Sequence, residues 1–229
     1  MALSNQCGTA VSIRHQLSRR WEELFFLSAF ILLFLQVAFF YSDIRSLAVL
    51  HGAIAWFAAF DTFVVSHVAY FTTPMFLPPL LLLLFSGKDT SWRRRYLDVL
   101  GVYVVCRLVV QFVGLNILVF DSVTPRFLLI TQLLFFLPYS LLVWGWIYWR
   151  LDINAKNRPR PFFRCDSCGE VPRPIDYFVA AFSSVFSASV SGIKGNYARS
   201  KILILLHGFM IYDVMGLTLS RAVALVQSR

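Results

Sequence analysis

Three charged side chains stand well inside apolar runs of this sequence, where a charge is costly unless it meets a partner or a wet cavity. They are Asp61, Arg107 and Asp213. Their opposite charges allow an ion pair that neutralises Arg107 and joins two helices. Asp61 and Asp213 compete for that role, so the sequence predicts the pair without choosing its acidic member. His207, near the start of the last apolar run, is predicted to be a hydrogen-bonded residue rather than a metal ligand or a proton relay.

Five serines fall close together between positions 183 and 191: Ser183, Ser184, Ser187, Ser189 and Ser191. Hydroxyl groups at this density can line a polar path through a membrane protein. Small side chains also let helices approach closely, so helix packing is the alternative. A short apolar helix precedes the last three serines, and this neighbour favours the path.

One cysteine pair has the spacing of a zinc knuckle, Cys165-Asp166-Ser167-Cys168-Gly169. A structural zinc ion needs four ligands, and the sequence holds no second pair of this kind and no neighbouring histidine pair. Cys165 and Cys168 are therefore candidate metal ligands only if a second subunit completes the site. A local disulfide or redox pair is another alternative. We expect a plain polar loop ahead of both.

Motifs for hydrolase, kinase or dinucleotide chemistry are missing from the sequence. Gly192 and Gly195 do not form a phosphate-binding loop, and no Ser-His-Asp set has a supporting context. We therefore expect no enzymatic activity and no cofactor.

The composition is that of a polytopic membrane protein: 229 residues, 58% hydrophobic and only 14% charged. The net charge of +9 resides mostly in Lys and Arg residues beside apolar segments, so membrane topology and anionic lipid explain it better than nucleic acid. Trp144, Trp146, Tyr148 and Trp149, followed by Arg150, are predicted to form an aromatic belt at a membrane surface. We expect the bilayer of the cell (plasma or inner) membrane as the surroundings.

The predicted fold is all-α, with five or six membrane spans. Five apolar segments are long enough to cross: Leu24–Tyr41, Leu47–Phe71, Val99–Phe120, Phe127–Trp149 and Ile202–Gln227. A sixth segment, Pro74–Phe85, is short, and Pro78-Pro79 is predicted to break it. Residues 1–126 are expected to form an N-terminal set of helices and residues 127–229 a second module.

The second module contains a helix that is too short to cross a bilayer. It is predicted over Asp176–Val185, with Pro174 and Asp176 at its start. Irregular backbone follows it, and at membrane depth such backbone is tolerated only where protein buries it or where it lines a wet cavity. The sequence therefore predicts a re-entrant element before the last span.

The order of motifs in this module matches a known family. Asp176-Tyr177-Phe178 opens the short helix, Ser187-Ala188-Ser189-Val190-Ser191-Gly192 follows it, and His207-Gly208 comes early in the last span. In this order the segment resembles, without a gap, the pore helix, selectivity filter and lining helix of the potassium-channel superfamily. Phe127–Arg150 corresponds to the outer helix, and Ser184 to a pore-helix Thr. The stretch Ala198–Gly208 also resembles a family of uncharacterised bacterial membrane proteins that share this C-terminal half.

The resemblance implies a channel-like protein that assembles as a homotetramer. Four copies of Asp213 would then form an acidic ring facing a central cavity, and Ser184 would lie nearby. Ser189 and Ser191 replace the two filter glycines, and Val190 replaces the Tyr, so potassium selectivity is not expected. Small cations can still pass along the segment Ser187–Gly192. The alternative is a non-conducting structural or accessory subunit with a plugged axis.

The basic residues give a second view of the topology. They cluster before the first span, around residues 88–95 and in the long connection 151–173. The positive-inside rule places all three clusters in the cytoplasm, which five spans allow and six do not. The channel resemblance instead places the connection 151–173 outside.

Overall fold

The structure, a computed structural model, describes residues 20–43, 55, 56, 59, 60, 63, 69–85, 92–120, 126–153, 161–165, 173–187, 190 and 192–227. In this part of the chain six helices and one two-stranded sheet are present. The helices are α2 (Trp21–Asp43), α4 (Ala69–Phe85), α5 (Arg93–Phe120), α6 (Arg126–Ile153), α7 (Pro174–Ser187) and α8 (Ala198–Gln227). The strands are β1 (Phe163–Cys165) and β2 (Ile193–Gly195). The predicted all-α class is thus confirmed.

Three helices are long and apolar enough to cross a membrane: Arg93–Asn116, Gln132–Ile153 and Ala198–Ser220. They confirm that spanning helices are present in the described part of the chain. The total of five or six spans stays a prediction, because most of the expected segment Leu47–Phe71 lies outside the described residues.

The helix α4 corrects the prediction for Pro74–Phe85. The helix continues through Pro74, Pro78 and Pro79 instead of breaking there. Proline removes a backbone hydrogen bond, but neighbouring helices can stabilise such a segment at membrane depth. One neighbour does so directly, because the hydroxyl of Tyr96 in α5 donates to the carbonyl of Phe76 in α4.

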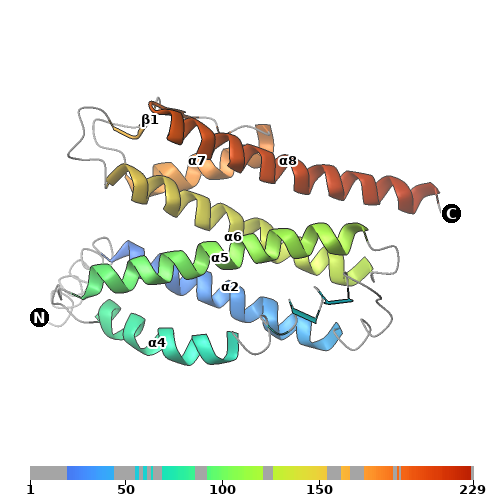
Figure 1. Cartoon of the computed structure of the whole chain (residues 1–229), viewed down its shortest axis with the longest axis horizontal. Coiled ribbons are helices and arrows are strands. Elements are labelled where there is room, and N and C mark those ends of the chain that lie inside the picture. The colour runs from blue at the N-terminus through green and yellow to red at the C-terminus, as the bar shows by residue number, and fades with distance from the viewer. Residues whose placement is uncertain are drawn as a thin grey trace, which may run out of the picture.

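The helix α6 lies at the centre of the arrangement, in contact with α2, α5 and α7. Figure 1 shows the long helices running side by side, with α4 beside α2 on one flank and α8 with α7 on the other. The core between α2, α5 and α6 is apolar and aromatic, with Phe26, Leu100 and Val143 fully buried. This packing covers the predicted aromatic belt: Trp144, Trp146, Tyr148 and Trp149 are all buried inside the protein. The belt prediction was therefore wrong, because α2, α7 and α8 cover this end of α6.

The two short strands close a loop in the chain. The strand β1 follows α6, β2 precedes α8, and they pair antiparallel with Arg164 opposite Lys194. Asn196 extends the connection by donating to the carbonyls of Phe162 and Pro161. The segment between the strands, which contains α7, therefore leaves and returns at the same end of the bundle (Figure 1).

Described members of the three basic clusters, among them Arg20, Arg93 and Arg164, lie at that same end. Glu23 forms one ion pair with Arg20, which precedes α2, and another with Arg93 at the start of α5. Arg150, near the end of α6, forms an ion pair with Asp98. The hairpin that carries Arg164 and Lys194 follows α6 directly. The five-span topology that the charge pattern favours, and the side of the membrane that this end faces, stay predictions.

Candidate functional site

The short helix α7 is the element that shapes the site. Pro174 is its first residue, and the carboxylate of Asp176 accepts the backbone N–H of Arg173 at 2.7 Å, which caps the start. The prediction of a short helix here is confirmed, with bounds two residues wider at each end than expected. One face of the helix is buried and the opposite face is exposed. The buried residues are Tyr177, Ala180, Ala181 and Ser184, and the exposed ones are Ile175, Val179, Phe182 and Phe186. Both faces are thus mainly apolar, and only one of them has a partner in the described structure.

Close approach between α6 and α7 depends on a glycine. A Cβ built on Gly145 of α6 would lie 2.5 Å from the ring of Phe178 in α7. The same ring lies 6.0 Å from Trp21 and 5.9 Å from Phe25, so it has little freedom to move away. Gly145 and the small buried residues of α7 therefore allow the two helices to pack tightly.

A buried polar cluster joins α6, α7 and α8. The hydroxyl of Tyr148 in α6 lies 2.9 Å from Nδ1 of His207 in α8, and Nε2 of His207 lies 3.3 Å from Oγ of Ser184 in α7. All three side chains are fully buried, and the ring of Trp144 stacks on His207 at 4.7 Å. His207 is thus hydrogen-bonded, as predicted, although it lies ten residues into α8.

The hydrogen bonds of this cluster assign the histidine tautomer. Ser184 donates its hydroxyl hydrogen to the carbonyl of Ala181 at 2.6 Å, so it can only accept from His207. Nε2 must therefore carry the hydrogen, and Nδ1 accepts from the hydroxyl of Tyr148. The result is a directed series of hydrogen bonds, Tyr148 to His207 to Ser184 to Ala181, with a neutral imidazole in the middle.

The serines of α7 bond mainly to their own helix. Ser183 donates to the carbonyl of Ala180 at 2.7 Å, and Ser187 donates to the carbonyl of Ser183 at 2.9 Å. Ala188, Ser189 and Ser191 lie outside the described residues. Val190 is buried, and Gly192 has a φ of 85°, a conformation that glycine adopts without strain. The polar path along Ser187–Gly192 stays a prediction.

Asp213 faces α5. Its Oδ2 accepts a hydrogen bond from Nδ2 of Asn116 at 2.9 Å, and the same amide donates to the carbonyl of Phe112. Arg107 is not its partner, so the alternative of an Arg107–Asp213 ion pair was wrong. The side-chain amide of Asn116 donates to this carboxylate instead. Asp61, the other predicted partner of Arg107, lies outside the described residues.

The structure describes one of the two cysteines that were predicted as candidate metal ligands. Cys165 is the last residue of β1, and Cys168 lies outside the described residues. Among the residues that the structure describes, no group of three or more His, Cys, Asp or Glu could hold a metal ion.

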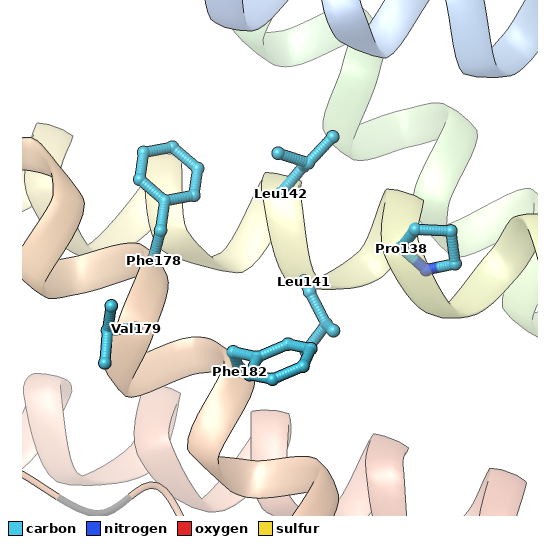
Figure 2. A pocket seen from close by; sticks show the side chains of 6 residues that line it. All are labelled: Pro138, Leu141, Leu142, Phe178, Val179 and Phe182. Carbon is cyan, nitrogen blue, oxygen red and sulfur yellow. The ribbon is translucent and has the colours of Figure 1, made fainter.

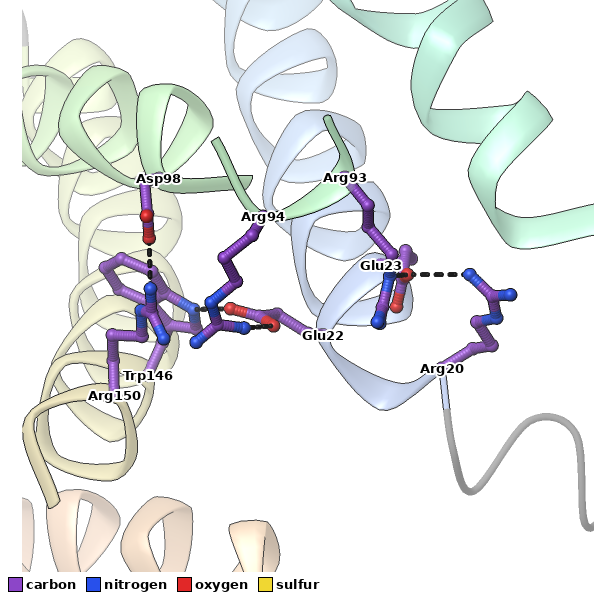
Figure 3. A network of polar contacts seen from close by, with 8 residues as sticks. All are labelled: Arg20, Glu22, Glu23, Arg93, Arg94, Asp98, Trp146 and Arg150. Carbon is purple, nitrogen blue, oxygen red and sulfur yellow. Dashed lines mark hydrogen bonds and ion pairs between the residues drawn. The ribbon is translucent and has the colours of Figure 1, made fainter. Parts of the chain in front are cut away.

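Sequence reasoning missed a network of charges at the shared end of α2, α5 and α6 (Figure 3). Glu23 accepts from Arg93 at 2.6 Å, and Glu22 accepts from Arg94 at 3.1 Å and from the indole of Trp146 at 3.2 Å. Burial raises the pKa of the Glu22 carboxyl above its ordinary value, and Arg94 offsets only part of this effect. Two adjacent glutamates directly before a long apolar run were the available signal.

An open apolar groove of about 420 Å³ lies between α6 and α7 (Figure 2). Six residues line it: Pro138, Leu141 and Leu142 from α6, and Phe178, Val179 and Phe182 from α7. The lining carries no charged or hydrogen-bonding side chain, so it suits an apolar group and not an ion.

A scan of protein-family models gave no match for this chain, and searches of curated proteins and of solved structures gave no significant match either.

Proposed function

We propose that this chain is a channel-like integral membrane protein in which α6, α7, residues 187–192 and α8 form a pore module. One observation carries the proposal. The pairing of β1 with β2 holds the two ends of the α7 segment together between two spanning helices. At about 1.5 Å per residue, a helix of this length covers roughly 21 Å of a hydrocarbon core about 30 Å thick. In the proposed arrangement the helix enters the membrane without crossing it, and the chain returns on the same side, as a re-entrant element does.

The proposed assembly is a homotetramer. The helix α8 exposes a long apolar face to its surroundings: Ile202, Leu205, Leu206, Phe209, Tyr212, Met215 and Leu219. The unpartnered face of α7 is apolar too, and Phe186 at its end is 78% exposed. In a tetramer these faces contact neighbouring copies and lipid.

The proposed permeant species are small cations, without potassium selectivity. Ser189 and Ser191 cannot adopt the glycine conformations that aim successive carbonyls at a dehydrated ion. Asp213 contributes a carboxylate from α8, within the proposed module. Each protomer of the tetramer then adds one negative charge near the axis, which attracts cations.

Ion flux into liposomes tests this function. The purified full chain is reconstituted, and sodium and potassium uptake are compared. We expect similar uptake of both ions, a decrease of about twofold or more for Asp213→Asn, and loss of flux for Ser189→Leu. Cys106→Ala serves as the matched control, because Cys106 lies exposed on α5 away from the module. Flux that is unchanged in both test variants would refute conduction along this path.

A non-conducting accessory subunit is the second candidate, and a specific observation favours it. The hydroxyl of Ser184 and the carboxylate of Asp213 are both engaged within one protomer, while the exposed face of α8 is apolar. Such a face seals an axis instead of hydrating it. A tetramer without flux of either ion would support this candidate.

A further inference from the structure

Arg107 is a buried charge without a counter-charge among the residues that the structure describes. It lies midway along α5 with only 3% of its surface exposed. None of its three guanidinium nitrogens donates a hydrogen bond within the described part of the chain. An arginine side chain keeps its charge in proteins, so a change of protonation cannot relieve this site. An acceptor that carries negative charge is therefore expected at Arg107.

The hydroxyl of Tyr139 beside this stretch of α5 is already engaged. Tyr139 of α6 donates its hydrogen to the carbonyl of Val104 at 2.9 Å, one helical turn before Arg107. Both Tyr139 and Val104 are almost completely buried. The tyrosine is neutral and does not compensate the charge.

Three buried glutamines extend from the neighbouring turn. Gln111 lies four residues after Arg107, on the same face of α5. Its Nε2 donates to Gln36 of α2, and Nε2 of Gln36 donates to Oε1 of Gln132 in α6 at 2.7 Å. Oε1 of Gln111 has no hydrogen-bond partner in the described structure.

This series of amides can be reversed as a unit. If all three amide groups rotate by half a turn, both interhelical hydrogen bonds form again with donor and acceptor exchanged. Gln111 then presents its NH₂ group instead of its oxygen. Because Gln111 follows Arg107 by four residues on the same helix face, that group can add a donor to those of the guanidinium, and such a set suits an acceptor-only ligand.

We propose that Arg107 and Gln111 form a buried binding site for a small monovalent anion, of the halide or carboxylate class, at the junction of α2, α5 and α6. One guanidinium among neutral neighbours balances one negative charge, so a divalent anion would leave an excess charge in the interior. Its two ligand residues lie on α5, and the proposal does not depend on conduction by the α6–α7–α8 module.

Chloride is the probe for the test. The thermal unfolding midpoint of the full chain in detergent is measured in sodium chloride and in sodium gluconate at equal ionic strength. A ligand that binds only the folded state raises the midpoint, so we expect chloride to raise it by several degrees over gluconate. The effect should disappear in Arg107→Gln and decrease in Gln111→Ala. Arg95→Gln is the matched control, since Arg95 is an exposed arginine of the same helix, and it should respond as the unchanged chain does.

A second measurement covers the case in which Arg107→Gln fails to fold. The line width of the chlorine-35 resonance should increase with the unchanged protein, and bromide should reverse the increase. Equal midpoints in chloride and gluconate without line broadening would overturn the proposal. A chloride response that persists in folded Arg107→Gln would also overturn it. If the midpoint does not respond to chloride, and if Asp61→Asn and Arg107→Gln lower it equally, then Asp61 of the chain itself is the counter-charge of Arg107. That result would also overturn the proposal.

Discussion

Replacing Tyr148 by Phe tests whether the buried cluster around His207 holds the pore-like module together. The change removes one hydroxyl from a fully buried ring and leaves the packing volume nearly unchanged. Nδ1 of His207 then loses its donor at 2.9 Å and stays buried without a partner. An unsatisfied buried acceptor costs about 1–3 kcal/mol. For a chain of this size, that corresponds to a decrease of about 2–12 °C in the thermal midpoint.

The assay is thermal unfolding of the purified chain in detergent, with two further variants. Ser183→Ala removes a partly buried hydroxyl that donates to the carbonyl of Ala180 in its own helix, so it should cost under about 0.5 kcal/mol. In a His207→Phe background the cost of Tyr148→Phe should shrink by about 1 kcal/mol, because the lost partner is already absent. If Tyr148→Phe costs no more than Ser183→Ala, or if its cost is unchanged in the His207→Phe background, the proposed cluster does not stabilise the module.

Two other sets of substitutions follow from the packing and the charges. Gly145→Ala should destabilise the chain by about 1–3 kcal/mol through a clash with Phe178. A Cβ at Gly216 would meet nothing within 4 Å, so Gly216→Ala should be neutral or stabilising by up to about 1 kcal/mol. Equal thermal midpoints for the two variants would contradict the tight α6–α7 contact. The raised pKa of Glu22 means that its stabilising contribution is complete below its ordinary pKa of 4.5 and is lost as the pH rises through the raised value. Glu22→Gln should therefore reduce the change in thermal midpoint between pH 4 and pH 7. If the change is as large as in the unchanged chain, groups other than Glu22 cause it. Glu23→Gln should lower the midpoint at pH 7 because it removes the ion pairs of Glu23 with Arg20 and Arg93. A midpoint equal to that of the unchanged chain would refute this.

The helices were predictable from the sequence, and their ends less so. Val99–Phe120 was predicted as a span, and the structure extends this helix back to Arg93. The added turn carries arginines that pair with Glu22 and Glu23, and a pairing across 70 residues is not visible in a local pattern. The short helix before the serines was predicted closely, because its cap and its length are local features.

The partners of the candidate site residues could not be predicted from the sequence. Ser184 was identified by the density of serines around it, but its partner His207 lies 23 residues further on, in another helix. Tyr148 and Trp144 were assigned to a membrane surface by their residue types alone. Their burial depends on α7 and α8 covering α6, which is a property of the tertiary arrangement. The alternative of an ion pair between Asp213 and Arg107 was wrong because the partner of Asp213 is a neutral asparagine, Asn116. The acidic ring in a tetramer stays a prediction.

The oligomeric state and axial structure of the purified chain in nanodiscs test the channel-like proposal most directly. Imaging by electron cryomicroscopy should show a tetramer in which the four α7 helices and the segments 187–192 surround a common axis. A monomer or a dimer in which this segment packs against its own bundle would contradict the proposal.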